Sequence, residues 1–390
     1  MDINSAIRVM LRTHVAALSL GSRANAMMLE SPPGIGKSDG CMKYAADLAR
    51  TLNERVGIVP FMLATISSVD VRGFMLPQKG TVPGTMDTVF STPPWFPTRW
   101  NAYVVDPDGT WSKPGTWEGD MPRVGVLFLD EFGQAEDEVK KPAAELLLKG
   151  GVGTFHLPDN WRVIAAGNRL TDRSGVMREL MFIVNRRCRL TVDPNLPAWL
   201  DWVDSQPAAF RPHYMTVSFA RQNPNIVFAD KVPDGSDPFC SPRTLCLLDR
   251  DLQALRSDED IANGCLPTDR DAREVAAGWI GSGSAAQFFT HLKYSDEMPE
   301  MKDIEADPRR ARLPEHKDAQ MVTGYMLAQN LTSTNADSVL AYVDRLQSEM
   351  QVMTMRAITQ RPDTSLHMVN TVGFTKWLAR HKNLLIASNS

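Results

Sequence analysis

Short apolar runs alternate with stretches of helical periodicity along the first half of the chain. The apolar runs predict short buried strands, at 26–29, 57–64, 124–130, 162–166 and 189–192. Apolar positions that recur every three or four residues predict helices, at 3–20, 37–52, 136–149 and 176–184. Because strands that alternate with helices form parallel sheets covered on both faces, we expect an α/β domain over residues 1–195.

After Pro194 the periodicity is mostly helical. It predicts helices at 198–204, 213–221, 243–255, 270–280, 284–292, 318–329, 336–357 and 371–386. The stretch 294–317 is rich in charge and contains proline, which is typical of a solvated linker. We therefore expect a helical domain at 196–293 and a helical C-terminal extension at 318–390.

Residues 74–120 interrupt the α/β pattern with many Pro, Gly and Trp residues and weak periodicity. They predict an insertion on the sheet, and long loops in compact domains are usually functional or mobile. The aromatic residues Trp95, Phe96 and Trp100 suit two interpretations. They could grip a protein partner, or they could form a small core beneath the loop.

The composition excludes several classes of protein. The chain has 390 residues, with 42 Lys and Arg against 46 Asp and Glu, and its net charge of −4 argues against a polybasic nucleic-acid binder. No apolar run approaches the roughly 18 residues that span a bilayer, so we expect no membrane insertion. The five cysteines are odd in number and lack zinc-site spacing, which indicates reduced thiols and a cytoplasmic location.

The strongest chemical signal is the segment SPPGIGKS at residues 31–38. It fits the phosphate-loop pattern G-x-x-x-x-G-K-[ST] except at Ser31, and it follows a predicted strand and opens a predicted helix. Glycine lets the backbone wrap a phosphate chain, and the helix N-terminus attracts the same anion. We expect Ser31 to alter the turn geometry without loss of binding. The expected nucleotide-binding residues are Pro33, Gly34, Ile35, Gly36, Lys37 and Ser38.

Two consecutive carboxylates, Asp130 and Glu131, end the strand predicted at 124–130. Ligands bind at the carboxyl ends of strands in parallel α/β sheets. We expect Ser38 and Asp130 to hold Mg²⁺ and Glu131 to polarise an attacking water. Alone, such a pair is often a solvated acidic turn, but the phosphate loop upstream favours the catalytic interpretation.

Together, SPPGIGKS, VLFLDE and the later strand that ends in AAGN resemble the Walker A, Walker B and sensor 1 elements of AAA+ ATPases. The resemblance implies a P-loop AAA+ fold, with a parallel sheet flanked by helices and then an all-α lid domain. It also implies that the chain binds and hydrolyses ATP with Mg²⁺. Asn168, at the sensor 1 position, would hydrogen-bond the attacking water or the γ-phosphate.

Within AAA+, the chain is most similar to the MoxR branch, and four stretches carry this likeness over residues 5–290. They are SVDVRG with the later PPWFP, WRVIAAGNR with Asp172 and Arg173, VNRR followed by Pro194 and Trp199, and CSPR at 240–243. By this resemblance Arg186 is the arginine finger, although its neighbour Arg187 stays an alternative. Arg243 is the sensor 2 candidate.

Arg169 and Arg173 flank the loop that follows sensor 1. They could face a subunit interface or simply be solvated, and the sequence does not separate these readings.

The resemblance implies a ring, of six copies as in MoxR relatives, that remodels or activates a protein client. Such clients can carry a von Willebrand factor A-type domain. The alternative is an AAA+ motor stimulated by nucleic acid, or a restriction-type NTPase, but the chain has no basic cluster of the kind that these proteins use. A nucleotide-gated scaffold with little turnover is a third hypothesis, and the intact acidic pair argues against it.

Overall fold

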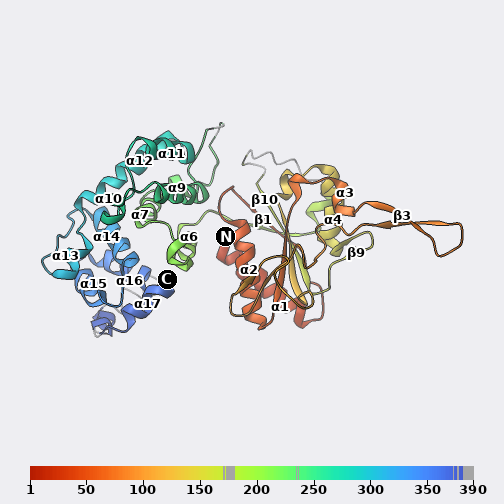
Figure 1. The fold of residues 1–390 in the computed structure, drawn as a ribbon, viewed down its shortest axis with the longest axis horizontal. Coiled ribbons are helices and arrows are strands. Elements are labelled where there is room, and N and C mark those ends of the chain that lie inside the picture. Colours follow the sequence, from red (N-terminus) through yellow and green to blue (C-terminus); the bar gives the residue numbers. More distant parts are fainter. Residues whose placement is uncertain are drawn as a thin grey trace. The chain divides into compact units, whose positions relative to one another are not determined.

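The computed structural model describes residues 1–169, 172, 181–233, 235, 237–371, 373–375 and 377–380. The chain divides into two compact units. The first, here called the α/β unit, is Met1–Pro194 with Asp230–Val232. The second, the helical unit, is Asn195–Ala229 with Pro233–Ser390. The predicted fold class, an α/β sheet flanked by helices and followed by a helical region, is confirmed (Figure 1).

A seven-stranded sheet of order β11-β1-β10-β7-β2-β5-β6 forms the centre of the α/β unit. Its strands are β1 (Met27–Ser31), β2 (Val56–Met62), β5 (Tyr103–Val105), β6 (Trp111–Ser112), β7 (Val124–Asp130), β10 (Trp161–Asn168) and β11 (Cys188–Thr191). The pairs from β11 to β2 are parallel, and β5 and β6 join antiparallel at one edge. The carboxyl ends of β1, β7 and β10 therefore lie at the same edge of the sheet.

Alternate residues of each strand point to opposite faces of the sheet. Helices cover both faces, so both are buried. One face packs against α1 (Ile3–Ser19) and α2 (Lys37–Leu52), and the other against α3 (Ser68–Arg72) and α4 (Asp137–Lys149). The first face buries Met27, Leu29, Val126, Phe128, Ile164 and Ala166. The second buries Met28, Leu127, Leu129, Val163 and Ala165. Such continuous apolar strands are typical of a parallel sheet covered by helices.

Trp161, at the start of β10, lies across two glycines in neighbouring strands. A Cβ at Gly125 would lie 2.3 Å from the indole, and one at Gly57 would lie 2.8 Å from it. The ring is fully buried, and its Nε1 donates to the Pro122 carbonyl at 3.0 Å. The glycines in β2 and β7 therefore make room for one large side chain.

The predicted insertion at 74–120 consists of two different parts. A hairpin of β3 (Met75–Lys79) and β4 (Met86–Phe90) extends away from the central sheet (Figure 1), and all ten of its strand residues are exposed. The second part supplies β5 and β6, and it buries Trp95 and Trp117. Exposed large apolar side chains concentrate on the hairpin: Phe74, Met75, Leu76, Val82, Met86, Val89 and Phe90.

The two interpretations of the aromatic residues apply to different side chains. Trp95 is fully buried and donates from Nε1 to the Val71 carbonyl at 2.7 Å, so it belongs to a core under the loop. Phe96 packs against the same core. Trp100 is 76% exposed, so a protein partner could contact its side chain. A second short hairpin pairs β8 (Gly151–Val152) with β9 (Phe155–His156).

The helical unit has one apolar core that includes residues from its first to its last described helices. Its α-helices are α6 (Leu196–Ser205), α7 (Tyr214–Gln222), α8 (Pro224–Val227), α9 (Pro242–Ala254), α10 (Asp258–Asn263), α11 (Arg270–Ile280), α12 (Ser282–Leu292), α13 (Met301–Ala306), α14 (Lys317–Gln329), α15 (Ala336–Val343), α16 (Ser348–Gln360) and α17 (Pro362–Val369). In α14 every residue from Ala319 to Ala328 is buried, and this helix packs against α7 and α16. The segments 196–293 and 318–390 thus share a core.

Two expectations for this region need correction. Residues 294–317 contain a short 3₁₀ helix and α13 rather than a free linker, and they contribute Ile304 and Ala311 to the core. The helix expected at 336–357 is two helices, because the chain turns between Val343 and Ser348. The helices expected at 371–386 and 176–184 lie partly outside the described residues, although 373–375, 377–380 and α5 (Met181–Val184) are helical.

Among the described residues, no helix combines the length and the apolar character that crossing a bilayer requires.

Candidate nucleotide-binding site

The phosphate loop joins β1 to α2 through two glycines with positive φ. Gly34 has φ of 80° and Gly36 has φ of 84°, a region that favours glycine. Gly36 is the N-cap of α2, and among the described residues no side chain caps the first turn. Backbone N–H groups at the start of α2 are thus available to an anion. Pro33 and Ile35 lie between and beside the glycines and are partly exposed.

Ser31 occupies the position where the phosphate-loop pattern has glycine. It is the last residue of β1, it is fully buried, and it lies beside Asn168 in the neighbouring strand β10. Its φ is not positive, so this backbone does not need glycine. The Ser31 hydroxyl donates to the Pro32 carbonyl at 2.9 Å. The expected change in turn geometry is therefore small.

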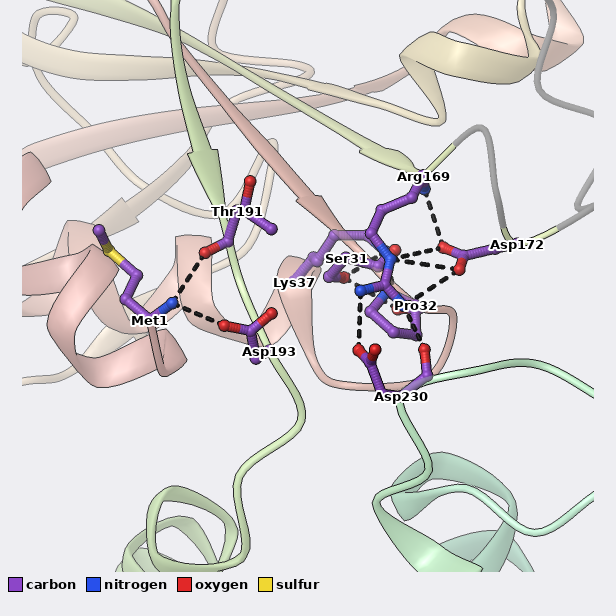
Figure 2. A network of polar contacts seen from close by, with 9 residues as sticks. All are labelled: Met1, Ser31, Pro32, Lys37, Arg169, Asp172, Thr191, Asp193 and Asp230. Carbon is purple, nitrogen blue, oxygen red and sulfur yellow. Dashed lines mark hydrogen bonds and ion pairs between the residues drawn. The ribbon is translucent and has the colours of Figure 1, made fainter.

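The Lys37 ammonium group lies at the carboxyl ends of β1 and β10. Its Nζ donates to Asn168 Oδ1 at 2.8 Å and to Ser31 Oγ at 2.9 Å. A longer contact joins it to the Pro32 carbonyl at 3.3 Å (Figure 2). The structure therefore brings together the lysine of the phosphate loop and the predicted sensor residue, which are 131 residues apart in the chain.

Ser38 and Asp130 also meet, as the predicted Mg²⁺ site requires. Ser38 Oγ donates to Asp130 Oδ2 at 2.7 Å, and the Glu131 amide donates to Asp130 Oδ1 at 2.9 Å. A hydroxyl and one carboxylate suit Mg²⁺, which usually keeps several waters and completes its shell with phosphate oxygens. The described residues hold no group of three or more His, Cys, Asp or Glu side chains arranged for a metal. Burial, together with the Asp130 charge, raises the pKa of the nearby Cys41 thiol.

Glu131 has a left-handed backbone, with φ of 54°. Among the described residues, Asn53 is the other non-glycine residue with positive φ. This conformation costs a glutamate of order 1–3 kcal/mol, and such residues cluster at functional sites. The Glu131 carboxylate makes no hydrogen bond or ion pair with the described residues. It is therefore available to a water molecule at the end of β7.

Arg186 and Arg187 differ in their surroundings. Arg187 is almost fully buried, pairs through Nη2 with Glu30 Oε1 at 3.3 Å, and lies over the Phe132 ring at 5.8 Å. Arg186 is partly exposed, and its Nη1 contacts the Ala144 carbonyl at 3.3 Å. Both arginines thus have contacts within their own chain, and the finger role of Arg186, with Arg187 as the alternative, stays a prediction.

Arg243 belongs to the helical unit. It is the second residue of α9, whose N-cap Ser241 forms a capping box with Thr244. Its side chain is exposed and makes no hydrogen bond or ion pair with the described residues. The sensor 2 role of Arg243 stays a prediction.

The residue after Asn168 forms a cluster that sequence motifs did not indicate (Figure 2). Arg169 contacts Asp172, which is buried, and Asp230, which is 61 residues further along the chain. No local pattern around Asp230 marks it as part of the site. The other flanking arginine, Arg173, lies outside the described residues.

Comparisons with known proteins add little to this geometry. No family model matches the chain, and no curated protein matches it. Two mutants of RuvB from Thermotoga maritima are similar to it, one with 12% identity over 94% of this chain and 86% of that chain at a TM-score of 0.34. The other has 10% identity over 94% and 90% of the two chains at a TM-score of 0.31. NtrX from Brucella abortus is similar with 12% identity over 99% and 67%, at a TM-score of 0.29. Likeness at this level carries no argument about activity.

Proposed function

We propose that the α/β unit binds ATP with Mg²⁺ and hydrolyses it, as an AAA+ ATPase of the MoxR type. One observation carries the proposal. At one edge of the parallel sheet, Lys37 contacts Asn168 and Ser38 contacts Asp130, at 2.8 and 2.7 Å. Residues predicted from separate motifs therefore form two contacting pairs, at the edge where ligands bind in α/β sheets.

Each group at this edge has a distinct part in phosphate binding. When ATP binds, the Lys37 ammonium leaves its neutral oxygen partners and contacts the β- and γ-phosphates instead. The backbone N–H groups at the start of α2 bind the same phosphates. Ser38 and Asp130 would hold Mg²⁺, which would supply positive charge against the phosphate oxygens.

Hydrolysis needs a water molecule held in line with the γ-phosphate. The free carboxylate of Glu131 accepts a proton from this water, and Asn168 fixes the position of the water or of a γ-phosphate oxygen. General-base catalysis of this kind contributes roughly 10²–10⁴-fold to the rate.

Two substitutions separate binding from hydrolysis. We expect Lys37→Ala to weaken ATP binding by about 100-fold or more, since a charge-assisted contact to phosphate is lost. We expect Glu131→Gln to retain binding and to lower the hydrolysis rate by about 100-fold or more. Titration with a fluorescent ATP analogue measures binding, and single-turnover hydrolysis with protein in excess detects slow rates.

The chain offers a matched control for each change. Lys43 lies on the same helix as Lys37 and pairs with Asp47 at 2.7 Å, so Lys43→Ala should leave binding unchanged. Glu138 is exposed in the first turn of α4, and Glu138→Gln should leave the rate unchanged. Wild-type protein that binds no ATP contradicts the proposal. Hydrolysis at the wild-type rate by Glu131→Gln contradicts the role of Glu131.

The same assay tests the proposal of a hexameric ring that remodels a protein client, such as one with a von Willebrand factor A-type domain. An arginine finger supplied by a neighbour is worth about 10³–10⁵ in rate. Arg186→Ala chains should bind ATP without turnover, and mixing them with Lys37→Ala chains should restore part of the activity. Chains that stay monomeric with ATP and Mg²⁺ contradict the ring.

Stimulation of ATP hydrolysis by DNA or RNA, with a strong dependence on salt, would instead favour the nucleic-acid motor. The net charge of −4 supports the protein client.

A further inference from the structure

Arg169 is held by two carboxylates immediately after the strand that carries Asn168. Its backbone amide donates to Asp172 Oδ2 at 2.9 Å, and its Nη2 lies 3.1 Å from Asp172 Oδ1. On the other side, Nη1 donates to Asp230 Oδ1 at 2.8 Å, and Nη2 donates to the Asp230 carbonyl. Figure 2 shows the Arg169 side chain between the two aspartates. We call Arg169, Asp172 and Asp230 the arginine clamp.

Asp230 reaches the clamp from a distant part of the chain. Residues 230–232 group with the α/β unit, whereas the residues immediately before and after them, through Ala229 and from Pro233, group with the helical unit. The chain therefore returns to the α/β unit for three residues. The contacts with Arg169 hold the first of these residues there.

The arginine clamp affects the orientation of Asn168 through the backbone. Asn168 is the last residue of β10, and its Oδ1 lies 2.8 Å from Lys37 Nζ. The Arg169 amide and side chain are both tied to Asp172, so the clamp sets the direction in which the chain leaves β10. The direction of the Asn168 side chain depends on that same exit.

We propose that Arg169 is a positioning residue for Asn168 and that Asp230 completes its clamp. The inference rests on the proposed ATPase activity. Arg169 does not touch the phosphates, and it acts through the residue that precedes it.

The two carboxylates differ in what their loss would do to folding. The Asp172 side chain is 2% exposed, so removal of its partner Arg169 would leave a buried carboxylate unpaired, which is strongly destabilising. The Asp230 side chain is 67% exposed, so its removal leaves no cavity. Substitutions at Asp230 therefore test the clamp in a folded protein.

The experiment measures the affinity for a fluorescent ATP analogue and the single-turnover rate for the full chain. We expect Asp230→Ala to slow hydrolysis by about threefold to tenfold, the range of an ion pair that is partly exposed but hydrogen-bonded. Nucleotide affinity should stay unchanged, because Lys37 and the phosphate loop are intact. Asp230→Asn keeps an oxygen acceptor for Arg169, and it should recover part of the rate.

Asp159 supplies the matched control at the opposite end of β10. Its side chain is 94% exposed and pairs with Arg23 at 3.0 Å. Arg23 also donates to two backbone carbonyls. The Asp159 pair therefore resembles the Asp230 pair, in which Arg169 also donates to a backbone carbonyl. Asp159→Ala should leave the rate unchanged.

The outcomes distinguish the inference from the proposed function. A wild-type rate in Asp230→Ala, with wild-type protein active, overturns the clamp and leaves the ATPase standing. An equal loss in Asp159→Ala also overturns it, because the effect would then be one of general stability. Wild-type protein that neither binds nor hydrolyses ATP removes the proposed function itself, and the inference with it.

Discussion

Two positions of the phosphate loop, Ser31 and Gly36, differ in backbone conformation. Gly36 has φ of 84°, whereas the φ of Ser31 is not positive. We expect Ser31→Gly to lower the free energy of unfolding by about 1–2 kcal/mol, because glycine gains chain entropy on unfolding and the hydroxyl contacts are lost. Nucleotide affinity should stay within about fivefold, since Asn168 still contacts Lys37. Urea unfolding and nucleotide titration measure the two effects.

Gly36→Ala is the comparison for this change. A Cβ at Gly36 would meet nothing within 4 Å, so its cost of about 1–2 kcal/mol is conformational. This substitution should also weaken nucleotide binding, because it disturbs the N–H groups at the start of α2. A gain in stability for Ser31→Gly would show that the native Ser31 contacts contribute nothing.

Residues of the candidate site could be predicted from sequence where a local motif carries them. The loop at 31–38 and the acids at 130–131 each follow an apolar strand, and parallel pairing then brings Ser31 beside Asn168. Asp230 could not be found in this way, since its contact with Arg169 joins residues 61 apart without a motif. The burial of Arg187 against Glu30 likewise depends on tertiary packing.

At the scale of elements, the β3–β4 hairpin joins the α/β unit at Gly73. Gly73 has φ of 87°, and a Cβ there would lie 2.2 Å from the Ser91 carbonyl oxygen. We expect Gly73→Ala to separate the base of the hairpin. Chymotrypsin should then cleave between residues 74 and 90 at least about tenfold faster, because cleavage follows the population of the opened form.

Gly84 provides a control at the other end of the hairpin. It has φ of 85°, and a Cβ there would meet nothing within 4 Å. Both substitutions carry the strain of a positive φ, about 1–2 kcal/mol. The difference between them therefore isolates the close approach to Ser91. Equal cleavage rates for the two variants would mean that this approach is unimportant.

Most strands and helices could be predicted from periodicity, because their apolar residues face a core. The stretch 294–317 is an exception, because its many charged residues predict a solvated linker although Ile304 and Ala311 are buried in the core. Its backbone is also held by distant side chains. Arg345 Nη1 donates to the carbonyls of Pro308 and Ala311 at 2.6 and 2.8 Å. A local sequence pattern does not reveal contacts between residues so far apart in the chain.

At the scale of the whole molecule, both units contain histidines that are buried in the neutral form. Burial lowers the pKa of His14 in the α/β unit to about 4, and the Arg162 charge adds to this effect. In the helical unit, burial lowers the pKa of His213 to about 3 and that of His291 to about 4. Unfolded histidine has a pKa near 6.5. Stability is therefore complete above pH 6.5 and falls as the pH drops below it.

We expect each histidine to cost roughly 2 kcal/mol of unfolding free energy between pH 7.5 and pH 5. Asp249 opposes this trend, because burial raises its pKa to about 6 and the folded protein binds a proton as the pH falls through that value. The histidines outweigh one carboxylate, so both units should be less stable at pH 5. Urea unfolding at the two pH values measures the change. Equal stability at pH 7.5 and 5, or an unchanged pH dependence in His14→Gln, would contradict the assignment.

The return of the chain at Asp230 has a consequence for biosynthesis. Domains fold as the chain is made from its amino end. The last strand of the sheet, β11, is complete at Thr191, but the second carboxylate of the arginine clamp follows only after α6, α7 and α8 of the helical unit have been made. A nascent α/β unit thus has its phosphate loop and acidic pair before Asn168 is fully held. Under the proposed role of the clamp, Asn168 would be fully positioned only after synthesis of the second unit has begun.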